Sequence, residues 1–171
     1  ILQSIAKYAS DSYDFAHHLM KNNQEVPEII LQSIAKDAEC SYDFANDLIR
    51  SNLEIPDRFL QKIANNAYLS YEFAKRLMNK NLEVPEIILK AIATNAEYSS
   101  YFADDLMDKN LEVPERFLQS IANDAKWSYN FAEYLKAYQE VPEIIKQSSK
   151  EYKDDLFTEN YFERIYDEVS L

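Results

Sequence analysis

The side chains whose types and spacing best suit the binding of a partner form five sets. Within a set the residues stand at i, i+3, i+4 and i+7, which places them on one face of an α-helix. The charges in these sets differ from copy to copy. The sets are Asp14, His17, His18 and Lys21; Asp43, Asn46, Asp47 and Arg50; Glu72, Lys75, Arg76 and Asn79; Tyr101, Asp104, Asp105 and Asp108; and Asn130, Glu133 and Tyr134.

A second candidate surface is one position that recurs along the chain and grows in apolar size. Large aromatic side chains are enriched at protein interfaces. The position is occupied in turn by Asp11, Cys40, Leu69, Tyr98 and Trp127. Both surfaces have a plainer interpretation: the charged sets form a solvated face that is free to vary, and the second position packs over a neighbouring segment.

From these two surfaces we select ten candidate residues for binding a protein partner. Charge complementarity would steer a basic partner toward them, and the aromatic residues would anchor it. The candidates are Asp43, Asp47, Lys75, Arg76, Tyr101, Asp104, Asp105, Asp108, Trp127 and Tyr134.

Catalytic and metal chemistry find little support in the sequence. His17 and His18 are adjacent, so on a helix they point about 100° apart and are poorly placed to hold one metal ion. Cys40 has no histidine near it in sequence. The chain contains no glycine, which excludes the P-loop and the dinucleotide fingerprint. We therefore expect no enzyme activity, no metal and no cofactor.

The charge balance restricts the partners. The net charge is −12, from 30 acidic against 18 basic residues, which opposes binding to nucleic acid or anionic lipid. Acidic residues also flank every proline, where the helix dipole accounts for them and a ligand-binding role is the alternative. These residues are Glu25, Glu54, Glu83, Glu112 and Glu140 before the prolines, and Glu28, Asp57, Glu86, Glu115 and Glu143 after them.

The elements that position these residues are set by a tandem repeat. Pro27, Pro56, Pro85 and Pro114 are spaced by 29 residues, and Pro142 follows after 28. A fixed period in this range is typical of stacked repeat proteins. The sequence divides into a truncated copy at 1–25, full copies at 26–54, 55–83, 84–112 and 113–140, and a final segment at 141–171.

Each copy predicts two short helices. In the first full copy, Pro27 opens a helix over about residues 27–38 as its first helical residue, and apolar residues follow at helical period. Ser41 is expected to cap a second helix over about 42–51. Asn52 is expected to end it in the left-handed conformation. Matching core positions are Ile34, Ile63, Ile92 and Ile121, together with Phe15, Phe44, Phe73, Phe102 and Phe131.

These features predict an all-α fold, a right-handed α-solenoid of stacked helical hairpins in one elongated domain. The handedness follows by analogy with most solenoids of this kind. After Pro142 the apolar stripe fades, and apolar residues return at helical spacing between Leu156 and Leu171. We therefore expect residues 141–171 to form a two-helix cap, because a solenoid needs a polar end to stay soluble.

The string Ile-Ala-x-x-Ala-x-x-Ser-Tyr-x-Phe-Ala, from Ile34 to Ala45, resembles a short helical tandem repeat of uncharacterised bacterial and phage proteins. The resemblance covers roughly residues 1–140 and implies no catalytic residues. The helix-turn-helix pattern is more distantly similar to tetratricopeptide repeats. Their period is about 34 and their Trp-Leu-Gly-Tyr spacing is absent here, so their peptide clamp is not carried over.

The function expected from the sequence is a non-catalytic scaffold that binds a basic protein partner through the outer face of the second helices. Two alternatives stay open: an acidic mimic of nucleic acid, of phage origin, that inhibits a DNA- or RNA-binding enzyme; or the recognition arm of a larger protein. The chain starts at Ile1 inside a repeat and without methionine, which suggests a missing N-terminus. No apolar run of membrane-spanning length and a single cysteine favour the cytoplasm.

Overall fold

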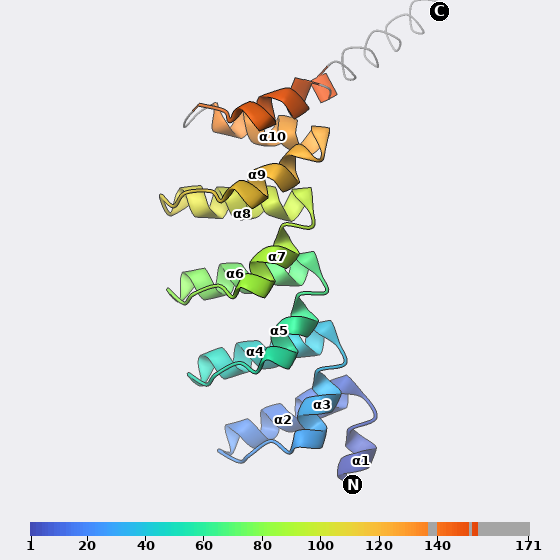
Figure 1. Ribbon diagram of the computed structural model, residues 1–171. Helices are drawn as coiled ribbons and strands as arrows, with labels where there is room; N and C mark the ends of the chain where they lie inside the picture. The colour runs from blue at the N-terminus through green and yellow to red at the C-terminus, as the bar shows by residue number, and fades with distance from the viewer. Residues whose placement is uncertain (137–139, 151, 154–171) are drawn as a thin grey trace, which may run out of the picture. The chain divides into compact units, whose positions relative to one another are not determined.

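The computed structural model describes residues 1–136, 140–150 and 152–153. Every regular element in this part of the chain is an α-helix, as predicted, and none of its helices is long and apolar enough to cross a membrane. The described residues belong to two compact units, Ile1–Ile92 and Ala93–Leu171, and each is described by itself. Figure 1 labels the helices.

The two units contain the same alternation of a short and a long helix. Unit 1 contains α1 (Leu2–Ile5), α2 (Ala9–Lys21), α3 (Glu28–Ile34), α4 (Ala38–Arg50), α5 (Asp57–Ile63), α6 (Ala67–Asn79) and α7 (Glu86–Ile92). Unit 2 contains α8 (Ala96–Asp108), α9 (Glu115–Ala122) and α10 (Ala125–Leu135), followed by helical residues 143–150 and 152–153.

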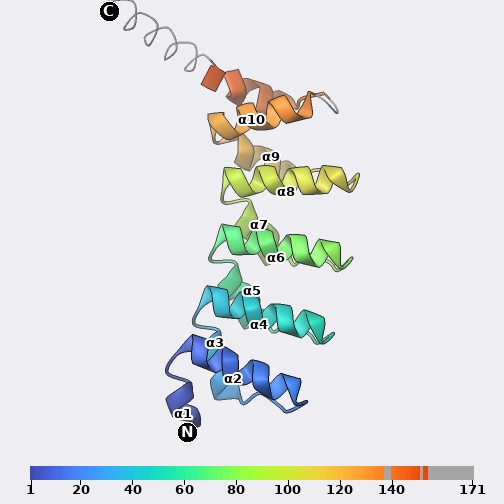
Figure 2. The same ribbon diagram turned by 180° about the vertical axis from the view of Figure 1, so that it is seen from behind.

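Packing within each unit joins neighbouring helices. In unit 1 each long helix packs on the short helix that follows it, and α2, α4 and α6 also pack on one another in sequence. Figure 2 shows these three long helices side by side on one face. In unit 2, α9 packs against both α8 and α10, and α8 contacts α10. The repeated segments therefore bury their apolar sides against adjacent copies inside each unit.

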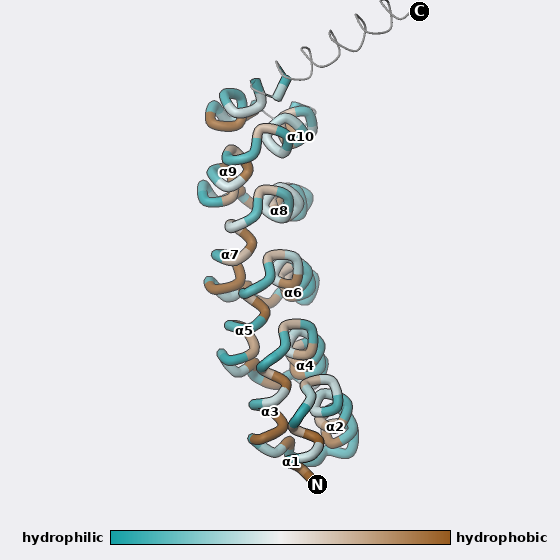
Figure 3. The backbone as a smooth tube through the Cα atoms, turned by 90° about the vertical axis from the view of Figure 1, so that its right-hand side faces the viewer, coloured by the Kyte–Doolittle hydropathy of each residue, from teal (hydrophilic) through white to brown (hydrophobic). Residues whose placement is uncertain are grey.

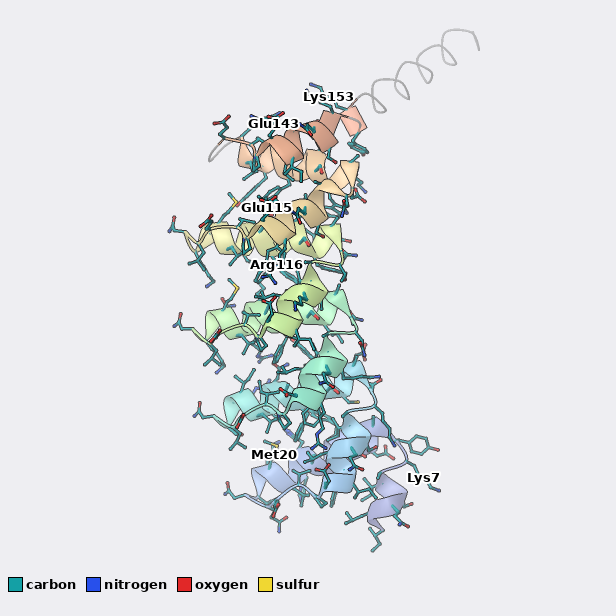
Figure 4. All side chains as sticks on the ribbon, viewed as in Figure 1. Lys7, Met20, Glu115, Arg116, Glu143 and Lys153 are labelled. Carbon is teal, nitrogen blue, oxygen red and sulfur yellow. The ribbon has the colours of Figure 1, made fainter. Side chains whose placement is uncertain are left out.

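The recurring apolar residues form the cores, as the sequence predicts. Ile34, Ile63, Ile92 and Ile121 are fully buried. The rings of Phe44 and Phe59, from adjacent copies, lie 5.0 Å apart, and those of Phe102 and Phe117 repeat this distance. Figure 3 shows hydrophobic residues on the short helices, while the long helices carry a hydrophilic outer side. Side chains fill the space between the helices of each unit (Figure 4).

The prediction that the recurring serines cap the long helices is wrong. The N-cap of α4 is Asp37, whose carboxylate accepts a hydrogen bond from the Cys40 amide at 2.9 Å. Ser41 lies one turn inside the helix and is buried. Its hydroxyl donates to the carbonyl oxygens of Asp37 and Ile34, at 2.6 and 3.2 Å. The serine thus ties the long helix to the end of the short one before it.

This correction moves the predicted helix boundaries. Because Asp37 and not Ser41 is the cap, α4 begins at Ala38 instead of about residue 42. The short helix α3 ends at Ile34 instead of about residue 38, since the chain must turn before the cap. Pro27 is the N-cap of α3 instead of its first helical residue. Asn66, Asn95 and Asp124 cap α6, α8 and α10 in the same way as Asp37.

The prediction for the C-terminal asparagines is confirmed. Asn23, Asn52, Asn81 and Asn110 have φ between 54° and 57°, the left-handed region in which asparagine replaces the absent glycine. After Asn52, the Leu53 amide donates to the Leu48 carbonyl at 2.9 Å, which completes a Schellman motif.

The described part of the predicted cap belongs to unit 2 and packs against α9 and α10 there. Val141 and Ile145 are buried in one cluster with Ile121, Phe131 and Leu135. The predicted helix from Leu156 to Leu171 lies outside the described residues.

Candidate functional site

Six of the ten candidate residues lie together in unit 2, on α8 and α10. The two helices contact each other, and Figure 2 shows them on the same face of unit 2. We call this group the acidic–aromatic surface. It consists of Tyr101, Asp104, Asp105, Asp108, Trp127 and Tyr134.

Trp127 is held in the first turn of α10. Its amide donates to the carboxylate of the N-cap Asp124 at 3.0 Å. The indole lies edge-on to the ring of Tyr101, with centroids 5.4 Å apart and an interplanar angle of 82°. Tyr101 is itself 38% exposed and its hydroxyl donates to Glu97 Oε1 at 3.2 Å. An aromatic pair of this geometry offers a fixed apolar anchor at the surface.

Asp104 lies beside this aromatic pair and is partly buried. Its Oδ1 atom is buried and has no hydrogen-bond partner in the described part of the chain. Burial, together with the nearby negative charges of Asp108 and Asp105, raises the pKa of its carboxyl to about 7. Asp108 is exposed, and its Oδ1 accepts a hydrogen bond from the Tyr134 hydroxyl at 3.4 Å. The carboxyl groups of Asp104, Asp105 and Asp108 therefore lie close together, and that of Asp104 is partly shielded from water.

The raised pKa predicts a pH dependence of stability. An unfolded aspartate has a pKa of about 3.9. Because the folded value is about 7, the folded state binds more protons between these values. The free energy of unfolding contributed by Asp104 therefore falls as pH rises from about 4 to about 7, and the loss is complete above that. We expect Asp104→Asn to raise the free energy of unfolding at pH 8 by about 1–2 kcal/mol, after allowing for solvent screening.

Urea unfolding at pH 4.5 and pH 8 checks this expectation. The difference between the free energies of unfolding at pH 4.5 and pH 8 should be smaller for Asp104→Asn than for the unchanged chain. Asp14→Asn, at an exposed position on α2, is the control and should leave that difference as it was. An equal pH dependence in Asp104→Asn and the unchanged chain would contradict the assignment.

In unit 1 the structure corrects the expectation for Asp47. This residue was expected on an outer face, but only 5% of it is exposed. Its Oδ2 lies 2.6 Å from His17 Nδ1 and accepts a hydrogen bond from the Tyr13 hydroxyl at 3.2 Å. Its Oδ1 accepts from the Arg50 guanidinium at 2.6 Å. Asp47 therefore joins α2 to α4 and is not available to a partner.

The physical reason is the packing of one long helix on the next. His17 and Asp47 are 30 residues apart, one more than the repeat. In the set on α4 the middle residues thus face the neighbouring long helix, and the outer residues point to solvent. The exposures agree with this, since Asn46 and Asp47 are buried whereas Asp43 and Arg50 are exposed. Asp104 was also expected on an exposed outer face, and it is instead partly buried.

The remaining candidates in unit 1 have individual environments. Although Asp43 is largely exposed, the partial burial of its carboxyl raises its pKa, and the charge of Asp47 adds to this. The Lys75 ammonium donates to the Tyr71 hydroxyl at 3.2 Å and lies 5.5 Å from the centroid of that ring. Arg76 is partly buried. The second candidate surface is mixed, because Leu69 is buried whereas Cys40, Tyr98 and Trp127 are partly exposed.

The environment of Cys40 is unlike that of a nucleophile. Burial raises the pKa of its thiol to about 11, and the nearby Asp37 carboxylate contributes in the same direction. Reactive cysteines need the opposite shift, since the thiolate is the attacking species. Among the described residues, no group of three potential metal-ligating side chains is close enough to hold a metal ion.

A hollow of about 590 Å³ in unit 2 is lined by several lysines, which is unusual in so acidic a chain. Lys136 forms an ion pair with Glu133. Lys146 lies 3.2 Å from Glu140 and 3.8 Å from Glu143. These carboxylates neutralise much of the positive charge, so the hollow is a weak candidate for an anion site.

Three exposed leucines were not recognised as candidates from the sequence. Leu53, Leu82 and Leu111 follow the left-handed asparagines and are 53%, 47% and 52% exposed. Their recurrence at the repeat period was a visible signal.

Comparison of the chain with known proteins yields no further assignment: no protein family, curated protein or solved structure matches it.

Proposed function

We propose that this chain is a non-catalytic repeat scaffold that binds a basic protein through the acidic–aromatic surface of α8 and α10. The observation that carries the proposal is the state of Asp104. Its buried Oδ1 has no hydrogen-bond partner among the described residues, and it lies near the exposed carboxylate of Asp108. A buried oxygen of this kind gains free energy when a donor reaches it.

A cation from a partner would compensate the charge of this partly buried carboxylate from its exposed side. A lysine or arginine side chain placed between Asp104 and Asp108 would lower the carboxyl pKa of Asp104 and keep it ionised at neutral pH. The edge-on pair of Tyr101 and Trp127 would bury an apolar side chain next to the cation. The net charge of −12 would accelerate the approach of a basic protein.

The test is affinity isolation from the source organism with the full chain as bait. The variant Tyr101→Ala/Asp108→Lys removes one anchor and reverses one exposed charge of the surface. Tyr8→Ala/Asp11→Lys is the matched control, because it makes the same two changes at exposed positions in unit 1. Circular dichroism would first establish that both variants keep the helical content of the unchanged chain.

The proposal predicts a basic protein whose recovery falls about tenfold with the first variant and is unchanged with the control. Equal recovery with all three baits would overturn it. The same isolation distinguishes the nucleic-acid mimic, which the net charge of −12 favours. If the recovered protein binds DNA or RNA and those polymers displace it from the bait, the mimic is the better description.

A further inference from the structure

Another surface lies at the C-terminal ends of the long helices of unit 1, where their loops lead into the short helices. In unit 1 the loop between α4 and α5 and the loop between α6 and α7 lie at the same side (Figure 1). Between them is a hollow of about 430 Å³. Its apolar lining comes from Ile49, Leu53, Ile55, Leu77 and Leu82.

The walls of the hollow are apolar, and the charged side chains at its edge are acidic. Glu54 and Glu83 are the ionisable residues of its lining, and both are exposed. Neither has an ion-pair partner among the described residues. No lysine, arginine or histidine contributes to the lining. Apolar walls next to uncompensated carboxylates suit an apolar side chain that is flanked by a cation.

Unit 2 contains a hollow built from the same positions of the repeat. Its volume is about 180 Å³. Five of its lining residues stand two repeats, or 58 positions, after residues that line the hollow of unit 1. They are Met107, Leu111, Glu112, Val113 and Leu135.

The local backbone structure explains why leucine occupies this position, but it does not explain why about half of each leucine is exposed. Leu53 is the residue that closes the Schellman motif, at which an apolar side chain commonly contacts the preceding turn. That role accounts for the residue type. It does not account for the half of each leucine that remains exposed.

We propose that the groove between these loops, defined by Leu53, Glu54, Leu82 and Glu83, binds a peptide segment that carries an aliphatic side chain next to lysine or arginine. The leucines bury the aliphatic group, and the two glutamates pair with the cations that flank it. The groove uses residues outside the acidic–aromatic surface, so it stands independently of the function proposed above.

The test uses the full chain and short fluorescein-labelled peptides, with binding measured by fluorescence anisotropy. One peptide alternates leucine with lysine. A second replaces its leucines by serine, and a third replaces its lysines by glutamate. We expect the first to bind, and each of the other two to bind at least about tenfold more weakly.

Two variants locate the binding. Leu53→Ser/Leu82→Ser removes the apolar walls, and Glu54→Lys/Glu83→Lys reverses the rim charges. Both should weaken binding of the leucine–lysine peptide by about tenfold. The controls are Ile29→Ser, an exposed apolar residue on α3, and Asp11→Lys/Glu39→Lys, which makes the same change in net charge at the first turns of α2 and α4. Both controls should bind as the unchanged chain does.

Methyl NMR spectra of the leucines provide a readout that does not depend on folding of the variants. Addition of the leucine–lysine peptide should shift the methyl signals of Leu53, Leu77 and Leu82 and leave those of Leu31 in place. The proposal is overturned if the serine–lysine peptide binds equally well, if the groove variants bind as tightly as the controls, or if the shifted methyls lie elsewhere. Self-association of the chain through these leucines, seen by sedimentation, would also overturn it.

Discussion

Truncation of Phe73 to alanine is expected to lower the free energy of unfolding by about 3–5 kcal/mol, the usual cost of a large-to-small change in a packed core. Phe73 is fully buried in α6. Its ring lies 6.1 Å from that of Tyr42, which belongs to the preceding copy. The substitution therefore opens a cavity at a contact between two copies, where neither copy can fill it alone.

Urea denaturation monitored by circular dichroism measures this loss. Ile29→Ala is the matched control, because Ile29 is an apolar residue on a short helix that is 37% exposed. The control should lose much less than the phenylalanine variant, since little buried volume is removed. A loss below about 1 kcal/mol for Phe73→Ala would contradict the core assignment, because surface substitutions fall in that range.

The second large effect is expected at Asp47. Replacing His17 and Arg50 together by alanine should lower the free energy of unfolding by about 3 kcal/mol, because it leaves a buried carboxylate without its two nitrogen donors. Among the described residues, the Tyr13 hydroxyl, at 3.2 Å, would then be the one hydrogen-bond partner left to this carboxylate. His17 and Arg50 are themselves 35% and 55% exposed, so their own removal costs little packing.

A companion variant separates the carboxylate from its neighbours. Adding Asp47→Leu to the alanine pair removes the buried charge, so it should recover a large part of the loss in the same denaturation experiment. A full loss that persists in the triple variant would show that the three side chains stabilise the contact by packing and not by charge.

Much of the fold could be predicted because five copies of the repeat stand in one chain and can be compared position by position. Positions that keep isoleucine and phenylalanine, such as Ile63 and Phe73, proved to be core. Asn52 and its equivalents were identified as left-handed since glycine is absent and asparagine tolerates that conformation best. The boundaries were less predictable, because Asp37 and Ser41 are both good N-cap residues and only the observed hydrogen bonds distinguish them.

The candidate site was only partly predictable for a different reason. Helical spacing identifies a face, but it does not state what lies opposite that face. Asp43 and Asp47 are one turn apart and share a face by sequence, yet one is exposed and the other is enclosed by α2. The contact of Tyr101 with Trp127 depends on how α8 packs on α10, which the sequence of either helix leaves undefined.

Aromatic NOE spectroscopy of the full chain tests most directly whether each copy buries its apolar side against the next. Contacts are expected between the rings of Phe44 and Phe59, whose centroids are 5.0 Å apart, and between Tyr101 and Trp127, at 5.4 Å. Each pair joins two adjacent copies within one unit. Observation of both sets of cross-peaks in the helical protein is the predicted result. A folded, helical chain that lacks both would contradict the packing on which the cores and both proposed surfaces depend.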